Sequence, residues 1–169
     1  MAKVELKGFN EYIRQLEAIE SKTTSFCKAV VYPGAKELAD AMSAEVAALP
    51  TITDAKAMRN YRDGYVQPHL SESQKAGLQD SLGITPIGKN ADGVVSAAVG
   101  FTGYNGVKTQ KFPNGQPNAE VARSLEKGTS YLQRDAFATR AVRKCRARAK
   151  RAMQAEADAQ MERIINNAK

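Results

Sequence analysis

Seven apolar residues between positions 27 and 49 recur at intervals of three or four, and this pattern restricts the fold most strongly. They are Cys27, Val31, Ala35, Leu38, Met42, Val46 and Leu49. The spacing places them on one side of an α-helix, so the segment is predicted to be helical and to bury that side. Pro33 and Gly34 predict a kink or a break near Tyr32, because an interior proline removes a backbone donor and clashes with the preceding turn. Pro50 is predicted to end the helix.

Two further segments have helical periodicity. The first contains Leu6, Phe9, Ile13, Leu16 and Ile19, and it predicts an amphipathic helix from Phe9 to Glu20. The second starts after Asp135, the predicted N-cap, and continues without proline or glycine to about Asn166. Small or apolar residues occupy an arc of about 120° on this last helix: Ala138, Ala141, Val142, Cys145, Ala149, Ala152 and Met153. Beyond Met153 the apolar stripe rotates, so the last turns are expected to pack on a different surface, another subunit being one candidate.

The middle of the chain carries shorter signals. Residues Thr51 to Leu70 have no sustained period and predict a long loop or arm, a candidate contact surface. Ser71 followed by Gln74 is a capping-box pattern, which predicts a short helix ending near Leu82. Residues 84–101 predict two strands joined by a turn from Asn90 to Gly93.

A second flexible, projecting connection is predicted over residues 102–118, which are rich in glycine, proline and asparagine. Pro117 and Asn118 then predict the start of a helix that Gly128 ends. The expected fold class is therefore α+β: a small antiparallel β-sheet flanked by helices, with a long amphipathic C-terminal helix and long projecting loops. At 169 residues, the chain is expected to form one domain over 1–169, with long loops at about 50–70 and 102–118.

The composition argues against catalysis and against metal or cofactor binding. The chain has two cysteines far apart, Cys27 and Cys145, which predicts two reduced thiols, and one histidine, His69, which is expected on an exposed loop. Glu37, Asp40 and Glu45 lie on a helix with no histidine nearby, and solvated carboxylates explain them. We therefore expect no catalytic residues, no cofactor and no metal. No apolar stretch is long enough to cross a membrane, and a soluble product without a secretion signal is expected.

Positive charge is concentrated in the second half of the chain. The net charge is +7, yet residues 1–84 hold 10 basic and 11 acidic groups, whereas residues 85–169 hold 15 basic and 7 acidic groups. Eight basic residues lie between positions 134 and 151: Arg134, Arg140, Arg143, Lys144, Arg146, Arg148, Lys150 and Arg151. Such a row can contact phosphates without sequence specificity. Its stretch "RKCRARAKR" contains no interleaved aromatic residue for base stacking. A solvated helix face, or pairing with acidic surfaces of a neighbouring ring, is the alternative explanation.

Several blocks, taken in order, resemble one protein family. They are "VELKGFNEYIRQLEAI", a second helix ending in "LP", "AGLQDSL" before a hairpin, and "VARSLEKGTS" followed by "DAFATRAV". The chain resembles the tail-completion and neck proteins of long-tailed bacteriophages, the gene-product-ten-like head-tail joining family, over most of its length. The matching positions are Glu126, Gly128, Thr129, Phe137 and Ala141. The chain departs from the family pattern at Lys127, where an aromatic is usual, at Ala136 and Arg140, where prolines are common, and in a longer Thr51–Leu70 segment.

The resemblance implies a structural virion protein with no catalytic residues. Such a protein forms a homo-oligomeric ring, with six-fold symmetry expected, at the phage neck or tail end. Its expected partners are the adjacent connector or neck protein, the tail tube or tail terminator protein, and DNA touched non-specifically in the channel. The expected location is the virion, after assembly in the host bacterial cytoplasm. On this reading the residues that face DNA or another ring are Arg140, Arg143, Lys144, Arg148 and Arg151. The alternative function is that of a small basic nucleic-acid-binding protein.

Overall fold

The computed structural model describes residues 9–166 and, within them, side chains from Lys22 onward. This part of the chain forms five helices: α1 (Phe9–Ala48), α2 (Asp54–Arg62), α3 (Glu72–Ser81), α4 (Asn118–Lys127) and α5 (Phe137–Asn166). It also forms six short strands: β1 (Thr51–Ile52), β2 (Leu70–Ser71), β3 (Leu82–Ile84), β4 (Gly88–Lys89), β5 (Val95–Ser96) and β6 (Val99–Phe101). The predicted α+β class, with a small antiparallel sheet and a long C-terminal helix, is confirmed.

Helix α1 is a single helix of 40 residues, so the predicted helix end at Glu20 is wrong. Of the predicted kink or break near Tyr32, the break does not occur. Pro33 lies inside α1, and the apolar stripe keeps its phase across it. Gly34 is buried where α5 crosses α1, and a Cβ atom on Gly34 would lie only 2.5 Å from Met153 Sδ. Close packing against α5 therefore outweighs the local cost of proline and glycine.

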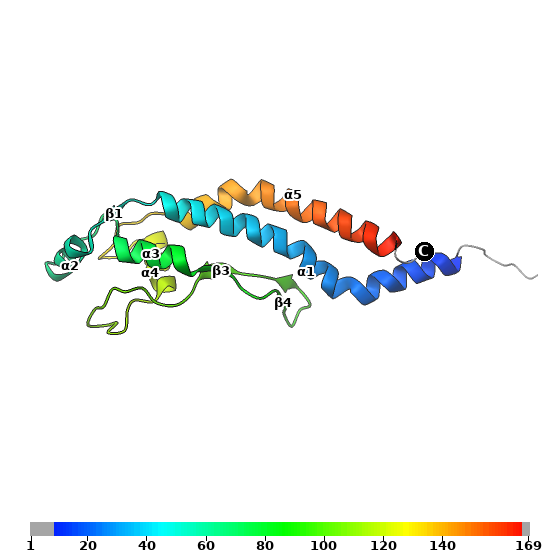
Figure 1. Ribbon diagram of the computed structural model, residues 1–169, viewed down its shortest axis with the longest axis horizontal. Helices are drawn as coiled ribbons and strands as arrows, with labels where there is room; N and C mark the ends of the chain where they lie inside the picture. The colour runs from blue at the N-terminus through cyan, green and yellow to red at the C-terminus, as the bar shows by residue number, and fades with distance from the viewer. Residues whose placement is uncertain (1–8, 167–169) are drawn as a thin grey trace, which may run out of the picture.

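Helix α5 runs alongside α1 over most of its length and gives the molecule an elongated shape (Figure 1). The hydrophobic core lies toward one end, where α3 and α4 pack against the C-terminal half of α1 and the start of α5. Its buried members include Met42, Val46, Leu78, Leu125 and Phe137. Toward the other end, α1 and α5 continue as a two-helix arm (Figure 1).

The predicted hairpin is confirmed. Strand β3 pairs with β6 and β4 pairs with β5, both antiparallel. In the turn, Asn90 Oδ1 accepts a 2.8 Å hydrogen bond from the Val94 amide, and Gly93 has a φ of 82°, which favours glycine. The hairpin lies along α1 on the side away from α5 (Figure 1). The predicted capping box is also present, since Ser71 and Gln74 exchange side-chain and backbone hydrogen bonds at the start of α3.

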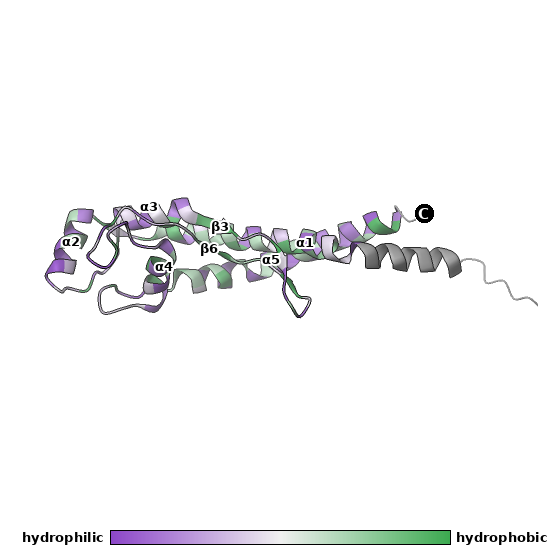
Figure 2. Cartoon of the chain, turned by 90° about the horizontal axis from the view of Figure 1, so that it is seen from below, coloured by the Kyte–Doolittle hydropathy of each residue, from purple (hydrophilic) through white to green (hydrophobic). Residues whose placement is uncertain are grey.

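The prediction of one long loop from Thr51 to Leu70 is wrong, because α2 occupies its centre. Thr53 caps α2, its Oγ1 accepting from the Lys56 amide, and Asp54 supplies an acidic first turn. This Thr-Asp pair was the local signal for the start of the helix. By contrast, residues 102–117 contain no helix or strand and extend away from the core, as predicted (Figure 1). Figure 2 shows hydrophilic residues on α2 and along this connection.

Candidate functional site

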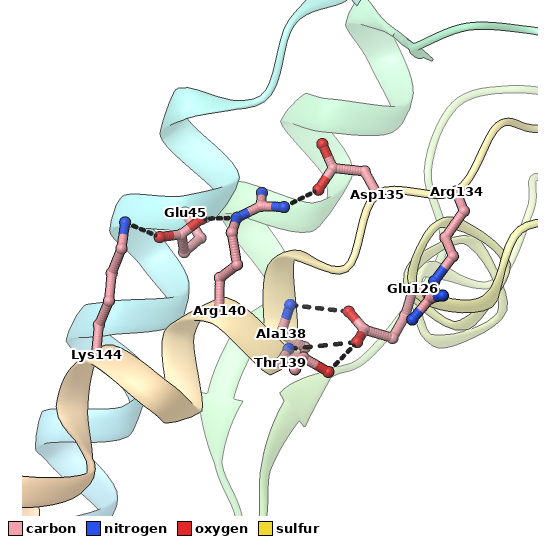
Figure 3. A network of polar contacts seen from close by, with 8 residues as sticks. All are labelled: Glu45, Glu126, Arg134, Asp135, Ala138, Thr139, Arg140 and Lys144. Atoms are coloured by element: carbon pink, nitrogen blue, oxygen red, sulfur yellow. Dashed lines mark hydrogen bonds and ion pairs between the residues drawn. The ribbon is translucent and has the colours of Figure 1, made fainter.

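Three residues of the predicted basic face pair with acids of α1. Arg140 Nε lies 2.8 Å from Glu45 Oε2, and Lys144 Nζ lies 2.5 Å from Glu45 Oε1 (Figure 3). Arg148 Nε lies 3.0 Å from Glu37 Oε2. Arg140 and Lys144 pair with Glu45, whereas Arg148, later on α5, pairs with Glu37, earlier on α1. This order is that of two antiparallel helices, and the pairs fix the register between them. Glu37 and Glu45, expected to be solvated, instead belong to the helix interface.

Glu45 is only 6% exposed and carries its charge at the α1–α5 interface. A buried carboxylate is tolerated when its oxygens are hydrogen-bonded to cations. The hydrogen bond from Lys144, followed by that from Arg140, lowers the pKa of Glu45 against the opposing effect of burial. Arg140 Nη1 also lies 2.6 Å from Asp135 Oδ1, and the hydrogen bonds to Glu45 and then Asp135 raise the pKa of Arg140. Arg140 thereby joins α1, α5 and the segment between α4 and α5.

Four other basic residues of the run up to Arg151 have no ion pair within the described part of the chain: Arg143, Arg146, Lys150 and Arg151. All four are exposed. At 100° per residue, Arg143, Arg146 and Lys150 form one stripe on the side of α5 away from the pairs with α1. Arg151 lies instead on the same side of α5 as Lys144, two turns further along the helix. The predicted basic face is therefore divided into an internally paired row and an unpaired row.

The residues that carry the family resemblance meet at the joint between α4 and α5. The Glu126 carboxylate accepts hydrogen bonds from the backbone amides of Ala138 and Thr139, at 2.9 and 3.3 Å (Figure 3). Glu126 therefore caps α5 from the end of α4, placing a negative charge at the positive end of that helix. The prediction that Asp135 caps α5 is wrong, since its side chain pairs with Arg140.

The other matching positions support the same joint. Gly128 has a φ of 76° as α4 ends, and Thr129 Oγ1 accepts hydrogen bonds from the amides of Tyr131 and Leu132 in the turn that follows. Phe137 is 1% exposed with its ring 6.0 Å from that of Phe101, and Ala141 is fully buried. The predicted structural roles of the helix-ending glycine and of the Phe137 core plug are confirmed.

An apolar groove of about 560 Å³ runs along the arm between α1 and α5. Most of its lining is apolar or small: Val30, Gly34, Leu38, Val142, Cys145, Ala149, Met153 and Ala157. Arg146 and Lys150, from the unpaired row, stand at its edge together with Gln154, and no acidic residue lines it. Val142, predicted to lie on the buried face, is 48% exposed here. Ile164 is buried within the chain, although its stripe was a candidate for contact with another subunit.

A second exposed apolar surface lies at the opposite end, around α2, in the segment predicted to be a candidate contact surface. Its members are Met58, Tyr61, Tyr65, Val66 and Tyr131, each at least 42% exposed. The contribution of Tyr131 to this surface was not predicted. The rings of Tyr61 and Tyr131 lie 6.0 Å apart, although the residues are 70 positions apart in the chain. Their proximity follows from the pairing of Gln67 with Leu132, a long-range contact that no local pattern encodes.

The remaining candidates form no reactive cluster. Cys27 and Cys145 are free thiols, as expected, with Cys145 buried on the apolar side of α5. His69, expected to be exposed, is partly buried before β2. Among the described residues no three His, Cys, Asp or Glu side chains gather as metal ligands. Within the same residues, no helix has the length and apolar character needed to span a membrane.

The chain matches no family model, no curated protein and no solved structure.

Proposed function

We propose that this chain is a structural virion protein of a tailed bacteriophage, forming a ring at the neck or tail end that joins the head connector to the tail tube. One observation carries the proposal: the folded chain leaves an apolar groove along its arm and an apolar surface at its α2 end uncovered. Isolated proteins rarely expose contiguous apolar surface, and such surfaces mark contacts with other subunits. The α4–α5 joint, built from the residues that carry the family resemblance, supports the same proposal.

The internal pairing of α5 favours assembly over nucleic-acid binding. Arg140, Lys144 and Arg148 form ion pairs with Glu45 and Glu37. These charges are therefore already neutralised within the fold and are less available to DNA phosphates. The ring needs no catalytic residue, and its work is to stack on neighbouring rings and leave a channel for DNA. Its partners in this proposal are further copies of the chain, the adjacent connector or neck protein, and the tail tube or tail terminator.

The second candidate function is nucleic-acid binding by the isolated protein, favoured by the unpaired row and Arg151. The two functions are separated by Gln substitutions at Arg143, Arg146, Lys150 and Arg151, which leave the pairs to α1 intact. If the protein binds DNA as its function, the wild type retains duplex DNA on a gel at physiological salt. The variant with all four substitutions then lowers the slope of log K against log salt concentration by about 4, at roughly 0.9 per phosphate contact.

The direct test of the ring is electron microscopy of the phage that encodes the chain, with gold-labelled antibody against the protein. We expect label at the junction of head and tail, and ring-shaped particles in the purified protein. Label elsewhere or nowhere on the particle, together with salt-dependent DNA retention that the variant with all four substitutions loses, rejects the structural role in favour of nucleic-acid binding.

A further inference from the structure

The groove between α1 and α5 has the form of a site for a third helix. Two antiparallel helices leave a furrow along their line of contact, and a third helix completes a bundle by laying its apolar side there. The lining is apolar over its length, and Val142 at its wall is about half exposed. Arg146 and Lys150 at the edge, with Arg143 one turn earlier, favour an occupant that carries acidic residues beside its apolar side.

Helix α1 extends further along the arm than α5 does. The two helices cross where Gly34 meets Met153. From Gly34, α1 runs back 25 residues to Phe9, whereas α5 runs only 13 residues from Met153 to Asn166. At 1.5 Å per residue, the difference leaves about 18 Å of α1 beyond the described part of α5. Figure 1 shows this overhang at the N-terminal end of α1.

The overhang corresponds to the segment Phe9–Glu20, which the sequence marks as amphipathic. Its apolar stripe continues through Ile13, Leu16 and Ile19, and it contains three glutamates but only one arginine. At 100° per residue, Glu17 falls at one edge of this stripe, 40° beyond Ile13, and Glu20 falls between Phe9 and Ile13. The segment is therefore an acidic amphipathic helix, the kind of occupant that the groove favours.

We propose that the Phe9–Glu20 overhang of one copy docks in the α1–α5 groove of a second copy. The overhang belongs to the continuous helix α1, so it cannot fold back onto its own groove. Because groove and overhang are different surfaces, the contact is head-to-tail, and such contacts close into rings or extend into filaments. The inference names a subunit contact of the ring and rests on the proposed function in that respect.

Complementary charge reversals test the contact. One variant carries Arg146→Glu and Lys150→Glu in the groove, and the other carries Glu17→Lys and Glu20→Lys in the overhang. Sedimentation velocity over a concentration series measures self-association of each full-length protein. We expect the wild type to associate and each variant to weaken association at least about tenfold, since like charges then face each other. An equimolar mixture of the two variants restores assembly, because every groove then finds an overhang of opposite charge.

The matched control is Arg123→Glu with Lys127→Glu, an exposed pair at the same spacing on α4, and it is expected to associate like the wild type. Thermal unfolding of each protein checks the fold, and Val142→Lys replaces the groove variant if that variant unfolds. A wild type that stays monomeric, a variant that associates normally, or a mixture that does not recover overturns the contact. Loss of the neck label in virions, with self-association intact, rejects the proposed function and leaves the contact standing.

Discussion

Replacing Glu45 by glutamine tests whether the internal ion pairs hold α1 and α5 together. The substitution keeps the shape of the side chain but removes the charge that receives Arg140 Nε and Lys144 Nζ. A hydrogen bond to a charged group contributes about 1.5–3 kcal/mol, and breaking a fully buried ion pair costs about 3–5 kcal/mol. Here the side chains of Arg140 and Lys144 are 43% and 69% exposed and regain water, so we expect a loss of about 2 kcal/mol.

Urea unfolding followed by circular dichroism at a fixed protein concentration measures this loss, with the slope against urea compared between proteins. Glu37→Gln is the matched control, because the Glu37 side chain is 33% exposed against 7% for that of Glu45, and it is expected to lose at most about 0.5 kcal/mol. Equal losses in the two variants, or no loss in Glu45→Gln, would refute the view that burial makes the Glu45 pair the stronger one.

The same carboxylate gives the fold a defined response to acid. The folded-state pKa of Glu45 is lowered from its ordinary value of 4.5 by the hydrogen bonds from Lys144 and Arg140. A depressed pKa contributes stability that is fully present above the unfolded value and is lost as pH falls through the folded value. The difference in unfolding free energy between wild type and Glu45→Gln is therefore expected to be constant near neutral pH and to shrink below pH 4.5. A difference that grows on acidification contradicts this assignment.

Three further substitutions test local features by the same unfolding assay. Glu126→Ala removes the cap of α5 and is expected to lower the free energy of unfolding by about 1 kcal/mol. The control, Glu120→Ala at an exposed position in the first turn of α4, should lower it less. Equal losses contradict the capping role. Ser71→Ala breaks the capping box of α3 and should also cost about 1 kcal/mol, more if its buried position leaves Gln74 unpaired. Gly34→Leu overfills the helix crossing and is expected to lower the free energy of unfolding by about 1–3 kcal/mol. Adding Met153→Ala makes room and should recover part of this loss. A double variant whose loss equals the sum of the two single losses contradicts the close contact.

Local signals predicted the elements whose ends are set by neighbouring residues. The capping box at Ser71, the turn from Asn90 to Gly93 and the glycine after α4 each satisfy backbone groups within a few residues, so their patterns are legible in one sequence. The long helix α5 was also predicted, because its 30 residues contain no proline or glycine and its apolar residues keep a helical spacing up to Met153.

Features that depend on distant residues were missed or misread. Pro33 and Gly34 read as a break because the sequence does not show that α5 lies against them at Met153. The cap of α5 was assigned to Asp135, the nearest acid, whereas Glu126 reaches it across the turn after α4. The exposed surface around α2 depends on the contact between Tyr61 and Tyr131, which belong to separate segments.

The meaning of the basic run changes once its partners are known. Eight basic residues would give a DNA-binding salt slope of up to about 7, at roughly 0.9 per phosphate. Three of the eight, Arg140, Lys144 and Arg148, pair with acids of α1, and Arg134 Nε donates to the Glu126 carbonyl. Four basic residues therefore remain without a partner in the run, and the largest expected salt slope falls to about 4. Two of those four, Arg146 and Lys150, line the edge of the apolar groove, where a docked acidic helix would engage them as well. A protein assembled through this groove therefore presents little of its sequence charge to DNA, and DNA affinity should fall as self-association rises.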